Sequence, residues 1–189
     1  MSINLKKNQK INLLKEVPSL KNVCVGLGWD KNKGLFNMDC DAYAYLRDSA
    51  GSITETVYFG NRKGAGDAVQ HMGDNLTGAG EGDDEQIIIH LDKLPKSCQS
   101  VVIAVNIFMA KMKFQDFSKV KNAFIRIVNT DSNSEICRFD ISGNPEYKGN
   151  NSMIFGKLLK NENQMWEFSA MGNSYKSSSQ MESDIRKNI

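Results

Sequence analysis

The stretch Gly73–Glu85 reads GDNLTGAGEGDDE and is the densest concentration of acidic residues in the sequence. It holds five acidic residues and four glycines, with no lysine or arginine. Because glycine adopts positive φ without strain, the backbone of such a loop can turn its carbonyls inward. Crowded carboxylates repel one another unless a cation lies among them, and flexible oxygen-only ligation suits Ca²⁺. The loop therefore predicts a calcium site, with a solvated acidic turn as the alternative.

Two other kinds of loop do not fit this stretch. In an EF-hand register that begins at Asp74, Glu85 occupies position 12, but positions 3, 5 and 6 hold Leu76, Gly78 and Ala79. A phosphate-binding loop needs inward N–H groups and usually a lysine. Since this loop has only negative charge, nucleotide binding here is disfavoured.

A second pair of carboxylates precedes the loop in the chain. Asp39 and Asp41 are two residues apart in a strand-like segment, so both side chains project from one face. Strand geometry could bring this pair beside Gly73–Glu85, where bound Ca²⁺ would offset part of the combined negative charge. A polar strand end is the alternative interpretation of the pair.

Composition places the chain among ordinary globular proteins. Its 189 residues are enough for one domain of ordinary size or two very small ones, and a composition of 40% hydrophobic and 24% charged residues allows a sizeable core. The N-terminal residues lack an uninterrupted apolar segment, so no signal peptide is predicted. No run approaches the roughly 18 apolar residues of a membrane helix. These features predict a cytoplasmic protein without direct membrane insertion.

The charged residues exclude some partners. The formal net charge is only +2, so overall charge favours no particular ligand. A modest cluster of lysines lies in one segment: Lys111, Lys113, Lys119 and Lys121. Nucleic-acid binding would require a basic stripe with stacking aromatic residues. We therefore expect a solvated basic surface and no nucleic-acid partner.

The four cysteines form no C-x-x-C pair, and only two histidines are present, which disfavours zinc. Reduced, buried thiols are expected. Cys40 lies between Asp39 and Asp41, whose charges disfavour a thiolate, so Cys40 is predicted to be a poor nucleophile.

Most predicted elements are β-strands bounded by turn residues. Three hairpins are expected, which turn at Asp48–Ser52, Thr130–Ser134 and Lys160–Asn163. Continuous apolar runs at Gln86–Leu91 and Ser97–Phe108 fit strands that are buried on both faces. This spacing of short strands predicts an all-β fold, a two-sheet β-sandwich.

Shorter segments are also predicted. The basic lead-in, with Leu5, Ile11 and Leu13, is expected to pair around a turn at Lys7–Lys10. One helical turn is expected at Phe114–Val120.

The sandwich domain is expected to span residues 1–176, and residues 177–189 differ from it. Ser179 and Glu182 have capping-box spacing. Apolar residues recur every four positions along one stripe: Met181, Ile185 and Ile189. A short C-terminal helix that lies on the sandwich is predicted, with a frayed polar tail as the alternative.

The acidic loop and its surroundings resemble the signature of the TerD family of tellurium-resistance and general stress-response proteins. The resemblance covers almost the whole chain, and the string G-D-N-x-T-G-x-G-x-G-D-D-E is highly specific. It is carried by these segments: Val25–Asp30, Asp39–Ala42, Asn61, His71–Asn75, Thr77–Gly78, Gly80–Glu85, Asn122–Arg126 and Met153–Gly156.

The resemblance implies a β-sandwich that binds two calcium ions near one end. It also implies a role in resistance to tellurite and other stresses without a catalysed reaction, in assemblies with a TerC-type membrane protein. The implied first ligand group is Asp39 and Asp41, with Asp30 close by. The implied second group is Asp74, Asn75, Asp83, Asp84 and Glu85, together with carbonyls of Gly78 or Gly80.

Two positions depart from the family pattern: Asn8 and the segment Asn106–Ala110. Asn8 stands where glycine is usual, and asparagine tolerates the same left-handed conformation. Asn106–Ala110 places Phe108 and Met109 in a stretch that is more polar in the family, and an extra hydrophobic contact is expected there.

Three other functions compete with calcium-dependent sensing or scaffolding. A calcium-independent interaction module is the first alternative. An enzyme that acts on a small molecule could use Asp83, Glu85 and His71 as acids and bases, but no set of nucleophile, base and orienting group is evident. Direct reduction of tellurite by thiols lacks a resolving cysteine.

Overall fold

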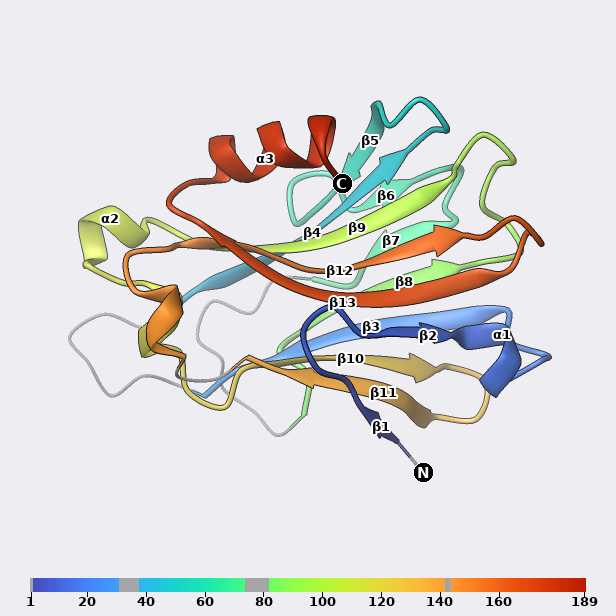
Figure 1. The fold of residues 1–189 in the computed structure, drawn as a ribbon, viewed down its shortest axis with the longest axis horizontal. Helices are drawn as coiled ribbons and strands as arrows, with labels where there is room; N and C mark the ends of the chain where they lie inside the picture. Colours follow the sequence, from blue (N-terminus) through green and yellow to red (C-terminus); the bar gives the residue numbers. More distant parts are fainter. Residues whose placement is uncertain (1, 31–37, 74–81, 142–143) are drawn as a thin grey trace.

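The computed structural model describes residues 2–30, 38–73, 82–141 and 144–189. Its strands form two sheets that face each other across a shared core (Figure 1). The first sheet has the order β1 (Ile3–Asn4), β11 (Ser134–Asp140), β10 (Phe124–Asn129), β3 (Asn22–Gly28), β8 (Glu85–His90), β7 (Val69–His71) and β6 (Lys63–Gly64). The second has the order β2 (Lys10–Asn12), β13 (Trp166–Tyr175), β12 (Ser152–Lys160), β9 (Ser100–Ile107), β4 (Cys40–Arg47) and β5 (Ile53–Val57).

The remaining elements are short helices that connect or cover the sheets: α1 (Leu13–Glu16), α2 (Ala110–Lys113), α3 (Ser178–Lys187) and the 3₁₀ turns η1 (Phe117–Lys119) and η2 (Pro145–Tyr147). The predicted two-sheet sandwich with a short C-terminal helix is confirmed. Each helix in the described residues is too short or too polar to cross a lipid bilayer.

The position of β9 between two apolar layers explains why its sequence is apolar without alternation. On one face, Val101, Ile103 and Val105 contribute to the core between the sheets. On the other face, Val102 and Ala104 belong to a second apolar cluster, which lies under α3. A strand buried on both faces has no solvent-facing side to carry polar residues.

Helix α3 covers the outer face of the second sheet (Figure 1). Met181 and Ile185 are fully buried against this sheet, as the four-residue apolar spacing predicts. The predicted cap at Ser179 is wrong, because Ser177 is the N-cap and its hydroxyl accepts a hydrogen bond from the Gln180 N–H (3.3 Å). Either serine can supply the capping oxygen, so the capping pattern alone could not choose between them.

The N-terminal lead-in does not form the expected hairpin. Strand β1 pairs with β11 in the first sheet, whereas β2 pairs with β13 in the second sheet. The lead-in therefore joins the two layers, because each of its strands finds a longer edge strand to extend. The turn between them contains Asn8 at φ 68°, which confirms the left-handed conformation expected there.

The segment after β9 contains the predicted helical turn and one more. The turn expected within Phe114–Val120 is the 3₁₀ turn η1, and an α-helical turn, α2, precedes it. Asp116 caps η1 by accepting a hydrogen bond from the Ser118 N–H (3.0 Å). Such a local side-chain acceptor favours a short turn over a continued helix.

Candidate functional site: a carboxylate-rich end of the sandwich

The acidic residues gather where β3 ends and where β8 and β4 begin. Antiparallel pairing of β3 with β8 places Leu27 opposite Glu85, so the residues that follow β3 lie beside those that precede β8. The Asp84 N–H donates to the Leu27 carbonyl (2.6 Å), and the Trp29 N–H donates to Asp84 Oδ2 (2.8 Å). These reciprocal bonds hold Asp84 against the end of β3.

Glu85 ties the two sheets together at this end. Its side chain points inward, on the same face of β8 as the core residues Ile87 and Ile89. Although it belongs to the first sheet, Glu85 Oε2 accepts a hydrogen bond from the Ala42 N–H in β4 (2.6 Å). His71 Nε2 lies 3.4 Å from the same carboxylate, and both side chains are fully buried.

Asp39 and Asp41 flank Cys40 at the start of β4, and all three side chains are buried. Alternation along the strand directs Cys40 into the core between the sheets and both carboxylates to the opposite face. Burial raises the pKa of the Cys40 thiol well above its usual value, and the charges of Asp41, Asp39, Glu85 and Asp84 raise it further. Cys40 is therefore a poor nucleophile, as predicted. Because four of the predicted ligands raise the pKa of this one thiol, their carboxylates lie close to one another.

Asn106 completes this side of the site. It is the register partner of Asp41 across the pair of β4 and β9, and both residues line a surface pocket of about 460 Å³. Asn106 Oδ1 is buried and accepts no hydrogen bond from a described residue. Two oxygen acceptors on adjacent strands therefore lie beside each other, an arrangement that a cation would stabilise.

Asp83 has a different environment from the other acids. Its carboxylate lies over Gly26, where a Cβ atom would overlap it, so the glycine makes this approach possible. Arg126 Nε of β10 lies 2.7 Å from Asp83 Oδ1, and this hydrogen bond is the largest cause of the raised pKa of Arg126. An arginine already compensates the charge of Asp83.

Asp30 and Asp84 form the edge of the site at the end of β3. Asp30 Oδ2 accepts a hydrogen bond from Asn122 Nδ2 (2.6 Å). Partial burial raises the pKa of Asp84, the bond from Trp29 lowers it, and the neighbouring charges of Asp83 and Asp30 raise it. These two acids therefore lie close enough to influence each other.

The structure thus brings six of the predicted ligands to one end of the sandwich: Asp30, Asp39, Asp41, Asp83, Asp84 and Glu85. The other four predicted ligands lie outside the described residues: Asp74, Asn75, Gly78 and Gly80. Within the described ranges, no group of three or more His, Cys, Asp or Glu side chains is arranged to hold a metal ion.

Sequence reasoning missed two residues of this end. Asn106 could have been identified only from the strand register, because nothing in its local sequence marks it as a ligand. Arg126 lies in the motif segment Asn122–Arg126, but its pairing with Asp83 depends on β10 lying next to β3.

This architecture defines the class of the protein: an all-β sandwich with a carboxylate-rich end built by both sheets. The chain belongs to the TerD family, since the TerD domain matches residues 1–181. It is 39% identical over 180 residues to general stress protein 16U of Bacillus subtilis, a match that covers 93% of this chain and 92% of that protein. It is also 38% identical over 179 residues to a tellurium resistance protein TerD of Alcaligenes, with 93% and 92% covered.

Comparison of structures agrees with this assignment of the fold. A crystal structure of a TerD homologue from Streptomyces coelicolor superposes with a TM-score of 0.72 at 21% identity, and the match covers 89% of this chain and 97% of that one.

Proposed function

We propose that this chain is a calcium-binding stress-response protein that acts by binding, as a sensor or scaffold, rather than by catalysis. The names of its relatives, a general stress protein and a tellurium resistance protein, support the cellular role. The observation that carries the proposal of a cation is the buried Asn106 Oδ1 beside Asp41. A carboxylate and an amide oxygen are hard donors of the kind that Ca²⁺ takes.

The chemistry of the donors fits calcium on both sides of this end. Asp39, Asp41 and Asn106 would contribute to one ion, and the segment that contains Asp83–Glu85 would contribute to a second. The ions would neutralise carboxylates that burial has brought together. Strands β4 and β8 begin at this end of the sandwich. Bound calcium ions would therefore stiffen the loops that lead into both strands and present a defined surface to a partner. We include a protein partner of the stress assembly, such as a TerC-type membrane protein, in this proposal.

Thermal unfolding with calcium and with chelator tests the proposal. A ligand present at about 100 times its dissociation constant stabilises a fold by about 2.7 kcal/mol, which corresponds to about 5–10 °C for a chain of this size. Asp41→Ala and Asn106→Ala should each reduce the calcium-dependent rise in Tm. Asp92→Ala removes an exposed acid beyond the other end of β8 and should leave the rise unchanged. A wild-type Tm that calcium does not move would refute calcium binding and favour the calcium-independent interaction module.

A further inference from the structure

Four exposed apolar side chains lie in helix α2 or directly before and after it: Phe108, Met109, Met112 and Phe114, which are 46%, 44%, 70% and 83% exposed. We call this set the α2 patch. Phe108 and Met109, for which an extra hydrophobic contact was expected, each keep nearly half of their surface exposed. Apolar residues gathered on one surface commonly mark a site of interaction with a protein or a membrane.

The backbone of the α2 patch adopts conformations that its residues disfavour. Met109 and Phe114, which bracket α2, have positive φ values of 54° and 53°. Glycine or asparagine occupies the left-handed position at a helix end with less strain. A bulky apolar side chain at each of these positions lowers stability and is exposed to water, so neither is explained by the folding of the described chain.

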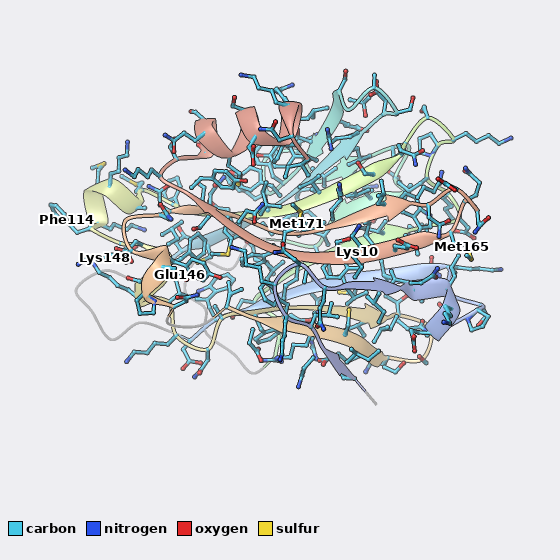
Figure 2. All side chains as sticks on the ribbon, viewed as in Figure 1. Lys10, Phe114, Glu146, Lys148, Met165 and Met171 are labelled. Carbon is cyan, nitrogen blue, oxygen red and sulfur yellow. The ribbon has the colours of Figure 1, made fainter. Side chains whose placement is uncertain are left out.

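Lysines lie among and around these apolar side chains. Lys113 Nζ lies 5.5 Å from the centre of the Phe108 ring, and Lys119 Nζ donates to the Phe114 carbonyl (2.6 Å). Lys111 and Lys176 line the same pocket as Phe114, which has a volume of about 650 Å³. Figure 2 shows Lys148 at this end of the molecule as well, together with Glu146. The acids that line the two adjoining pockets, Asp41 and Asp116, are buried.

We propose that the α2 patch docks peripherally on an anionic lipid bilayer. Helix α2 lies at one extremity of the molecule (Figure 1), where it can approach an extended surface. Apolar side chains from such a segment bury in the interfacial region, while lysines attract anionic headgroups and keep their ammonium groups in water. Among the described residues named here, five lysines outnumber the one exposed acid, Glu146. This excess of positive charge favours an anionic surface over a neutral one.

This docking differs from membrane-spanning insertion, for which the chain has no predicted segment, and it goes beyond calcium binding. The two sites are nevertheless neighbours. The Phe108 N–H donates to the Asp39 carbonyl (2.8 Å), and Asp41 lines a pocket together with Phe108 and Met109. Neutralising these acids would remove a repulsion from anionic headgroups.

The test is sedimentation of the full chain with vesicles of phosphatidylcholine alone or mixed with phosphatidylglycerol, in chelator and again in calcium. We expect binding to the anionic vesicles that falls at high salt, where screening shortens the range of charge attraction. Met112→Ser with Phe114→Ser should weaken binding by about tenfold or more. Lys111→Gln with Lys176→Gln should weaken it by about thirtyfold, or about fivefold per lysine.

Lys93→Gln with Lys96→Gln is the matched control, because it makes the same change of net charge at two exposed lysines between β8 and β9. It should bind as the wild type does. Binding in either solution that depends on the α2 patch supports docking, and binding in calcium alone would show that the neighbouring acids must first be neutralised. Three outcomes would overturn the proposal that the α2 patch docks on an anionic bilayer: equal affinity for both kinds of vesicle, no binding in either solution, or normal binding by the patch variants. So would a wild-type dimer that Met112→Ser with Phe114→Ser converts to a monomer, since the patch would then bind a second copy.

Discussion

Replacement of Glu85 by alanine is expected to loosen the connection between the two sheets. Glu85 is 1% exposed and accepts the hydrogen bond from the Ala42 N–H across the core. An alanine would leave this N–H buried without its acceptor, which costs about 1–3 kcal/mol. Alanine keeps Cβ, so the loss of the one buried Cγ methylene group adds about 0.8 kcal/mol. Glu85→Ala should therefore lower the free energy of unfolding by about 2–4 kcal/mol.

Glu85→Gln removes the negative charge at this position and keeps nearly the same side-chain shape, so it measures the effect of the charge alone. Glutamine keeps both methylene groups and an oxygen that can accept from Ala42, so we expect a smaller loss of about 1–2 kcal/mol. The corresponding falls in Tm are about 10 °C for alanine and about 4 °C for glutamine.

Urea unfolding in excess chelator measures these differences without a contribution from bound calcium. Glu162→Ala, at an exposed position in the turn between β12 and β13, is the control and should change stability by no more than about 0.5 kcal/mol. If Glu85→Ala cost no more than this control, the hydrogen bond between the sheets would not stabilise the fold and the reasoning would fail.

The remaining predictions concern the buried thiols, α3 and the approach of Asp83 to β3. Burial raises the pKa of Cys24 and Cys137 to about 12, so above about pH 8.5 the folded chain retains protons that the unfolded chain loses. Stability should therefore fall as pH rises from about 8.5 to 12, by up to about 1.4 kcal/mol per pH unit for each thiol; urea unfolding across this range should give a shallower fall for Cys137→Ala, and equal slopes would contradict the argument. Met181→Ala removes a fully buried side chain and should cost about 2–5 kcal/mol in the same assay, and a loss near zero would mean that α3 does not contribute to the cooperative fold. Gly26→Ala would displace the Asp83 carboxylate and should cost about 1–3 kcal/mol; combination with Asp83→Ala should recover part of that loss, and full additivity of the two substitutions would show that they do not interact.

Much of the sandwich could be predicted because strand signals are local. The hairpin turns and the apolar runs lie within a few residues of the observed strands, and the stripe of Met181 and Ile185 correctly predicted a buried helix face. The errors fall where several local solutions have similar energies. Neighbouring serines could both cap α3, and the short strands β1 and β2 could pair with each other or with the edges of larger sheets.

The carboxylate-rich end was predictable in composition but not in its pairings. Spacing alone predicts that Asp39 and Asp41 share a face, and the density of acids near Glu85 led us to expect a compensating cation. Spacing cannot show that Asn106 is the partner of Asp41, that Arg126 takes up Asp83, or that Glu85 reaches Ala42 in the other sheet. Each of these contacts joins residues that are distant in the chain.

The order of residues by itself determined most of the strand segments, the apolar face of each, and the two segments in which acidic residues are concentrated. Only the tertiary structure decided that Arg126 pairs with Asp83 and that Asn106 lies next to Asp41. The physical reason is that alternation along a strand depends on neighbouring residues, whereas the choice of partner strand and register depends on the packing of the whole core.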